Sequence, residues 1–539
     1  MTRRTEAKGR NLIKGRTLSL GARTKTLPIK WTLSVGLAVC LLIYILRLDA
    51  VAGELIDDAW YILLAKALAT GHGFTVINAP APLVTHFYPH PAFVALLSLV
   101  FRIAPHFPAN VFLMKTISIV AIMLAGWFTY RYFAVVKETA PHFAAGITVA
   151  TLLTPAIVFL ATSTVMSECV FIFLQTATIV LVERSLRANS RKRDWFMVLA
   201  AAVLAGIAFL TRPIGIGLLA AAVIYLFITK RLLKALGFSI LVSFIVIPWL
   251  VYSHHVPQES PINDPRFPAQ PYTSVFAKKL PQFVESDVGG ILLPSLYRTP
   301  SESGLEVLGM QPRLGMDPYT IFISLVLSGL CLWGFIVTTR RSLGMAEITV
   351  FLSLLMILFG SVGASFRYLL PLAPFFIFYA LEGIIGLRGI SRRRVIRSSL
   401  KDGLRWERVG TIFLLLIISL NLYDHAAYLL CKFHLTKARI GWIDRSEESK
   451  QLLQWVSANI DPATVVATEN APLVNLYTGL KTLPDLDPVN DKDELRRKGA
   501  KLFVHISPYF ASSVLLDDPR FHVLYYTKES NFYVLSLDP

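Results

Sequence analysis

Charged residues are scarce in this chain of 539 residues. They make up 16% of the sequence, whereas a soluble globular protein carries about 25%. Hydrophobic residues make up 54%, and the mean hydropathy is +0.56. A chain with this balance cannot hide its apolar surface from water as a soluble domain does, so it is predicted to be an integral membrane protein.

Cysteine is also rare, and the cysteines that occur are scattered. There is no C-x-x-C pair, so neither a disulfide framework nor a zinc site is indicated. The four cysteines, three of them inside apolar stretches, are Cys40, Cys169, Cys331 and Cys431. The last part of the chain, from about residue 440 to 539, lacks a Gly-rich phosphate loop, a nucleophile elbow and paired metal ligands. We therefore interpret it as a docking or acceptor-side domain and not as the catalytic one.

Acidic residues are outnumbered by basic ones, giving a net charge of +18. The lysines and arginines gather in short stretches between apolar runs, as in the cytoplasmic loops of membrane proteins. This pattern indicates membrane topology, and no nucleic-acid partner is expected. The basic segment 1–28 is predicted to be cytoplasmic. No A-x-A-like cleavage site ends the apolar run that follows, so this run is interpreted as an uncleaved first span.

The apolar runs predict about eleven transmembrane helices within a membrane domain at 29–429, because a helix of about 20 apolar residues crosses a bilayer. The predicted spans are 29–47, 110–131, 143–161, 168–184, 195–211, 214–229, 235–252, 319–338, 345–363, 368–387 and 409–429. The run 91–104 is shorter, begins at Pro91 and carries Arg102. It is predicted to be a re-entrant or interfacial helix.

The distribution of basic residues orients these spans. With a cytoplasmic N-terminus, basic stretches such as "ERSLRANSRKR" and "RGISRRRVIR" lie in the cytoplasm. The other side receives a first external loop with interfacial helices (48–109), a long loop (253–318) and everything after residue 430. Counting 91–104 as a crossing would reverse every later loop. We therefore expect a multi-pass protein of the inner (plasma) membrane with an extracytoplasmic C-terminus.

The two long external segments differ in composition. Residues 253–318 are rich in proline and polar residues, which is typical of a lid, a binding element or a disordered loop. Residues 440–539 are predicted to form a small α/β domain. In it, "SEESKQLLQWVSANI" is expected to be a helix with Ser446 as its N-cap. "ATVVAT" and "KLFVHIS" are expected to be buried strands, and "FHVLYY" and "NFYVLSL" a hairpin.

Unusual polar residues gather on the predicted external side. Ionisable groups at membrane depth are costly and therefore suggest function. They follow the first span (Asp57, Asp58), open a later one (Glu168), or occupy the outer corners of two others (Arg212, Arg367 with Tyr368). The first external loop adds Tyr61, His86, Tyr88 and His90.

Each of these residues also has a structural explanation. Asp58 could cap the helix that begins there, and Glu168 could pair with a buried partner. Arg212 and Arg367 could extend their charged ends to the membrane interface. The two histidines could be ordinary loop residues, and Tyr61 could belong to an interfacial aromatic belt. The coincidence of all of them on one side favours a site.

The chemistry of this set suggests group transfer from a lipid phosphate. A carboxylate can take a proton as general base or hold a divalent cation such as Mg²⁺ or Mn²⁺, with Asp57 and Glu168 as the ligands. An arginine guanidinium suits a phosphate leaving group, which it binds through two hydrogen bonds.

Five segments in order resemble the GT-C integral-membrane glycosyltransferases, in the bacterial branch of protein O-mannosyltransferase-like and lipid A aminoarabinose transferase-like enzymes. They are "DDAWYILLAKALATGHGF", "YPHPAFVALLSLVFRI", "VMSECVFIFLQ", "LAGIAFLTRPIGIGLLAA" and "FRYLLPLAPFF". The pair at 57–58 is Asp-Asp where Asp-Glu is commoner, and Ala92 stands where a second proline is usual.

The resemblance implies a polyprenyl-phosphate-sugar donor and a hydroxyl or amine acceptor on a glycan, lipid or protein. It makes Asp57 the catalytic carboxylate, Glu168 a second acid, and Arg212 and Arg367 partners of the lipid phosphate. We also assign Asp58 to the catalytic group and Tyr368 to the phosphate-binding group. The acceptor or donor loop is predicted to contain Tyr61, His86, Tyr88 and His90. We predict an inverting hexosyl or pentosyl transferase. The alternative is a transporter or flippase of lipid-linked sugars. A third hypothesis, a sensor or scaffold, leaves the external acids unexplained.

Overall fold

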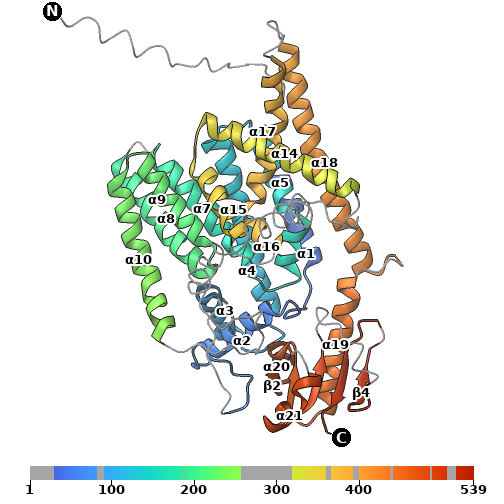
Figure 1. Cartoon of the computed structure of the whole chain (residues 1–539). Coiled ribbons are helices and arrows are strands. Elements are labelled where there is room, and N and C mark those ends of the chain that lie inside the picture. The colour runs from blue at the N-terminus through green and yellow to red at the C-terminus, as the bar shows by residue number, and fades with distance from the viewer. Residues whose placement is uncertain are drawn as a thin grey trace, which may run out of the picture.

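The computed structural model shows a long helical body with a small sheet domain at one end (Figure 1). It describes residues 29–81, 90–187, 190–255, 318–359, 366–392, 400–436, 441–485, 488–506, 518–527 and 529–538. The predicted basic N-terminus, nearly all of the loop 253–318, and the site candidates His86 and Tyr88 lie outside the described residues.

Each of the eleven predicted spans contains a helix. The helices of the body are α1 (Ile29–Arg47), α4 (Val111–Arg131), α5 (Pro141–Leu152), α6 (Pro155–Thr162), α7 (Glu168–Ser185), α8 (Arg191–Thr211), α9 (Gly215–Ile228), α10 (Leu232–His255), α14 (Pro318–Arg341), α15 (Met345–Phe359), α16 (Phe366–Leu369), α17 (Ala373–Arg392) and α18 (Leu400–Lys432). Among the described helices, 6 are long and apolar enough to cross a membrane. A seventh span results if α5 and α6, which meet at 52°, count as one.

Two helices of the body cross with their backbones in direct contact. A Cβ atom built on Gly334 of α14 would lie 1.8 Å from the Tyr379 carbonyl oxygen of α17. One built on Gly383 of α17 would lie 2.2 Å from the Leu330 carbonyl oxygen of α14. Helices in membranes pack through such small residues because lipid gives no hydrophobic drive for their association.

Two short helices lie between the helical body and the sheet domain (Figure 1). They are α2 (Asp57–Ala69) and α3 (Pro91–Ile103), each of 13 residues. At 1.5 Å per residue such a helix is about 20 Å long, less than the roughly 30 Å of a bilayer core. The length of α3 therefore fits the predicted re-entrant or interfacial helix.

The C-terminal domain is the small α/β unit predicted from the sequence. Its elements are α19 (Gly441–Asn459), β1 (Val465–Thr468), α20 (Ala471–Thr478), β2 (Lys481–Pro484), α21 (Pro488–Arg497), β3 (Ala500–His505), β4 (His522–Tyr526) and β5 (Tyr533–Ser536). The strand order is β2-β1-β3-β5-β4, with β1 parallel to β2 and β3, and β4 and β5 forming the predicted antiparallel hairpin. The expected N-cap at Ser446 was wrong, because α19 begins at Gly441 and Ser446 lies inside it.

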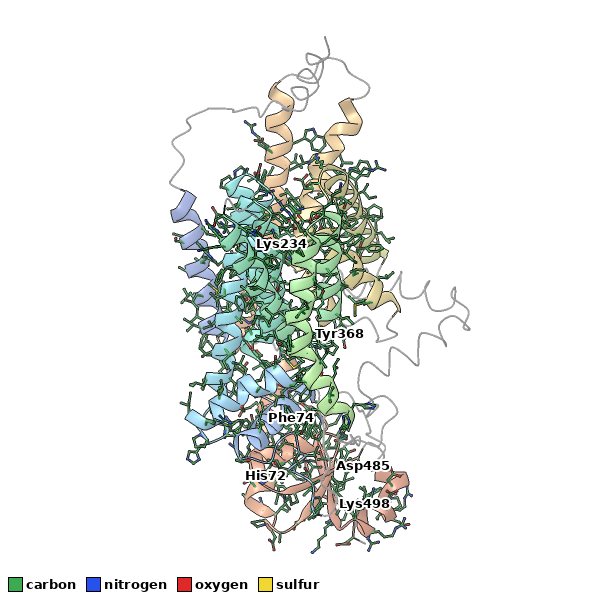
Figure 2. All side chains as sticks on the ribbon, turned by 90° about the vertical axis from the view of Figure 1, so that its left-hand side faces the viewer. His72, Phe74, Lys234, Tyr368, Asp485 and Lys498 are labelled. Carbon is green, nitrogen blue, oxygen red and sulfur yellow. The ribbon has the colours of Figure 1, made fainter. Side chains whose placement is uncertain are left out.

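The sheet connects the domain to the helical body. Successive side chains of a strand point to opposite faces. On one face, Val466 and Val504 belong to the same buried apolar cluster as Trp60 of α2. On the other, Ala467 and Phe503 belong to a separate cluster within the domain. In Figure 2, Lys234 lies in the half of the body away from the domain, Tyr368 lies closer to the domain, and Asp485 lies where the domain meets the body.

Candidate active site

Four of the predicted residues form one connected network of charges. The Arg367 Nη2 atom lies 3.0 Å from Asp57 Oδ2, and its Nε atom donates to Glu168 Oε1 at 2.7 Å. The same Glu168 oxygen lies 2.6 Å from Arg212 Nη1. The order Asp57–Arg367–Glu168–Arg212 thus alternates carboxylate and guanidinium, so every charge in it has an opposite neighbour.

Each member of the network stands at an end of a helix. Asp57 and Glu168 are the first residues of α2 and α7, where a negative charge complements the helix dipole. Arg212 follows α8 in an extended conformation (φ −151°, ψ 129°), as is usual for a residue before proline. Arg367 lies in the single turn of α16. The ends of elements far apart in the sequence therefore build the site.

The network has a buried half and an open half. The Glu168 side chain is 0% exposed and that of Arg212 is 4% exposed, whereas Arg367 is 21% and Asp57 38% exposed. The buried pair orients Arg367, and the open pair can contact a substrate. Ser167, which the sequence analysis did not single out, accepts a hydrogen bond from Arg212 at 3.4 Å.

Aromatic residues from the predicted set lie beside the network. The guanidinium of Arg212 lies 5.4 Å from the ring centre of Tyr368. The rings of Tyr61 and His90 are 5.1 Å apart, and both residues are buried. Burial, with the charge of Arg212, lowers the pKa of His90 to about 3. His90 is therefore neutral at ordinary pH and adds no charge to the site.

The two adjacent aspartates point to different surroundings. Asp58 is buried, and its carboxylate turns back to the preceding loop. There it accepts backbone hydrogen bonds from Gly53 at 2.8 Å and Leu55 at 3.0 Å, and it also accepts one from Ala59 at 3.1 Å. The predicted catalytic role of Asp58 stays a prediction. Its hydrogen bonds to Gly53 and Leu55 fix the loop that precedes α2.

A strained turn directly precedes Asp57. Ile56 has φ 63° and ψ −59°, and the Asp57 N–H donates to the Leu55 carbonyl at 2.6 Å. This is a γ-turn of the rare strained type. A β-branched residue with positive φ costs about 1–3 kcal/mol and persists only where its surroundings enforce it. The sequence carries no signal for this turn, because isoleucine normally avoids the conformation.

The described donor set does not form a divalent cation site. Asp57 and Glu168 are the predicted ligands, but the Arg367 guanidinium lies between their carboxylates. Among the residues that the structure describes, no three His, Cys, Asp or Glu side chains gather closely enough to hold a metal ion.

A buried glutamate links the same loop to the C-terminal domain. Glu54 Oε2 accepts a hydrogen bond from the Ser446 hydroxyl at 3.0 Å. Burial raises the pKa of Glu54 to about 8, against about 4.3 in an unfolded chain. Between these two values the folded protein holds a proton that the unfolded chain has released. The stability that Glu54 contributes is therefore present below about pH 4 and is lost as the pH rises to about 8.

This linkage predicts how Glu54→Gln changes the pH dependence of stability. Glutamine keeps an oxygen for Ser446 and does not ionise. We expect the melting temperature of the wild type to fall, relative to that of the variant, between about pH 5 and pH 8.5. Thermal unfolding of both proteins in detergent measures this difference. Parallel pH profiles would contradict the burial of an ionisable Glu54.

The fold is similar to those of solved GT-C membrane glycosyltransferases, as predicted from the sequence. ArnT from Cupriavidus metallidurans in the apo state has a TM-score of 0.54 and 13% identity, over 94% of this chain and 98% of that one. The same protein bound to undecaprenyl phosphate has a TM-score of 0.55 and 13% identity, over 95% and 98%. The oligosaccharyltransferase of Archaeoglobus fulgidus in the apo form has a TM-score of 0.56 and 11% identity, over 95% and 74%. No protein-family model and no curated protein sequence matches the chain.

Proposed function

We propose that this protein is a membrane glycosyltransferase that moves a sugar from a polyprenyl-phosphate donor to an acceptor. The observation that carries the proposal is the open Asp57–Arg367 pair, backed by the buried Glu168–Arg212 pair, in a fold of this class. The structures with similar folds include ArnT bound to undecaprenyl phosphate, and AglB with an inhibitory peptide and a dolichol-phosphate. These ligands support a lipid phosphate and an external acceptor as the substrates.

The proposed reaction is a single displacement. The acceptor hydroxyl or amine attacks the anomeric carbon of a hexose or pentose, and Asp57 takes the proton from the attacking group. The bond from the anomeric carbon to the phosphate oxygen breaks, and the lipid phosphate leaves with the electron pair. Arg367 stabilises the charge that develops on this oxygen. Attack opposite to the leaving group inverts the anomeric configuration.

The buried members of the network would support this step without contacting the substrate. Glu168 accepts from both arginines through one oxygen, so it fixes the direction of the Arg367 side chain. Tyr368, beside the Arg212 guanidinium, would help to bind the donor phosphate. Tyr61 and His90 are buried, and their role in an acceptor or donor loop stays a prediction. The reaction would take place on the extracytoplasmic side, where α2 and the C-terminal domain are predicted to lie from the positive-inside pattern.

The test is to reconstitute the purified protein in vesicles with a panel of labelled polyprenyl-phosphate sugars and hydroxyl or amine acceptors. We expect labelled acceptor and free polyprenyl phosphate to form together. Movement of intact lipid-linked sugar across the vesicle, with no cleavage, would instead identify a transporter. Absence of cleavage with every donor would contradict the proposed enzyme.

A further inference from the structure

We propose that the C-terminal domain positions Asp57, with Asn470 as the positioning residue that connects it to the loop 51–56. The inference rests on the proposed function, because it assigns the domain a part in the work of Asp57. The domain acts through α20, whose first turn lies against this loop.

Three consecutive residues of the loop are held by side chains of the C-terminal domain. The Asn470 Nδ2 atom donates to the Gly53 carbonyl at 2.8 Å. The Tyr477 hydroxyl accepts from the Ala52 N–H at 3.3 Å and donates to the Ala52 carbonyl at 3.2 Å. Glu54 is held by Ser446, as described above. The domain therefore binds backbone groups and not only surface side chains.

The loop is fixed from its other side by the helical body. Gly53 donates its N–H to Asp58 while its carbonyl accepts from Asn470, so both sides of this residue are bound. Gly53 has φ 96°, and a Cβ atom there would lie 2.8 Å from Leu473 of α20. The loop thus has two anchors, residues 52–54 on the C-terminal domain and Asp58 at the start of α2, with Ile56 between them.

The two anchors of the loop keep the strained turn at Ile56 from relaxing. An unfavourable backbone conformation relaxes unless its neighbours prevent it. Relaxation at Ile56 would rotate the next residue, which is Asp57, away from Arg367. The contacts of Asn470 and Tyr477 therefore hold the open pair of the site together from outside the helical body.

Asn470 is itself held firmly. It follows β1 and caps α20, where its Oδ1 atom accepts from the Leu473 N–H at 3.4 Å. The neighbouring Glu469 contacts His505 and accepts from the Ile506 N–H at 3.4 Å, which ties the ends of β1 and β3 together. These strand ends lie on the side of the sheet domain that faces the helical body. In Figure 2, Asp485 is near the body and Lys498 is away from it.

The test variant is Asn470→Asp. A carboxylate still accepts from the Leu473 N–H and remains a good cap, but it cannot donate to the Gly53 carbonyl. We expect kcat to fall by about 10-fold or more while KM for the donor changes less than about 2-fold. The melting temperature should fall as well, because the buried carboxylate at position 470 faces the Gly53 carbonyl without a hydrogen bond, so kcat is compared well below the melting temperatures of both proteins. Asn459→Asp is the control, since among the described residues the Asn459 side chain bonds within its own helix, to the Trp455 carbonyl.

A second measurement does not depend on sugar transfer. Hydrogen exchange of the segment 51–58 should become faster in Asn470→Asp and in Tyr477→Phe, and stay unchanged in Asn459→Asp. Adding Ile56→Gly to Asn470→Asp should recover part of the lost rate, because glycine adopts a positive φ without strain.

The outcomes separate the two proposals. Unchanged exchange in the loop, or full kcat in an otherwise active Asn470→Asp protein, overturns the positioning role. If the wild type transfers no sugar but exchange rises in the variants, the proposed function fails, and the contact by which the domain holds the loop is supported on its own.

Discussion

Asp57→Asn is expected to lower the rate of sugar transfer by about 10²–10⁴-fold, the usual contribution of a general base. The amide is nearly the same size as the carboxylate but cannot take a proton from the acceptor. The side chain is 38% exposed and has one described ion-pair partner, Arg367, so the fold should tolerate the change. The rate is measured by release of labelled sugar from the donor, and the fold by thermal unfolding.

Asp58→Asn is the matched control for this prediction. The carboxylate of Asp58 accepts from three backbone N–H groups, one of them on an oxygen of its own. An amide NH₂ group in place of that oxygen would face the Gly53 N–H without accepting from it. Asp58→Asn should therefore lower the melting temperature, whereas Asp57→Asn should not. Transfer at the normal rate by Asp57→Asn would refute the role of Asp57 as base.

Glu168→Gln is expected to destabilise the protein by about 3–5 kcal/mol, because removing one partner of a buried ion pair leaves the other charge uncompensated. Glu168 is 0% exposed and accepts from Arg212 and Arg367 through a single oxygen. An amide oxygen could keep one of these hydrogen bonds but not the negative charge. The loss should appear as a lower melting temperature in detergent.

Glu382→Gln serves as the control for a charge pair outside the site. Glu382 lies 2.8 Å from Arg341, whose side chain is 61% exposed. Exposed pairs contribute about 0–1 kcal/mol, so this variant should melt near the wild type. Equal losses from the two glutamate variants would contradict the buried character of the network.

Much of the fold could be predicted from local patterns in the sequence. The apolar runs marked the helices of the body, because a membrane helix needs an unbroken apolar stretch. The run 143–161 was predicted as one span, but it is a bent pair of helices that meet before Pro155. The N-cap at Ser446 failed because α19 continues back to Gly441, and the position of a helix start depends on packing as well as on capping residues.

The candidate site, like the fold, could be predicted only in part from the sequence. The outer ends of predicted spans brought Asp57, Glu168, Arg212 and Arg367 to one side, since topology alone places the ends of helices. The sequence could not tell which carboxylate meets which guanidinium. It also could not reveal the contact between Asn470 and Gly53, which are 417 residues apart. Such pairs depend on how whole helices and domains dock.

The shared apolar cluster of the two parts has a consequence for how the chain can be divided. Val466 and Val504 of the sheet pack in one cluster with Trp60 of α2. A chain shortened to end after α18 would expose apolar residues of α2 that the C-terminal domain helps to bury. A separated C-terminal domain would expose Val466 and Val504 to water. Both fragments would acquire an aggregating surface. We therefore expect the two parts to fold as a single unit, so that the C-terminal domain is not a removable module.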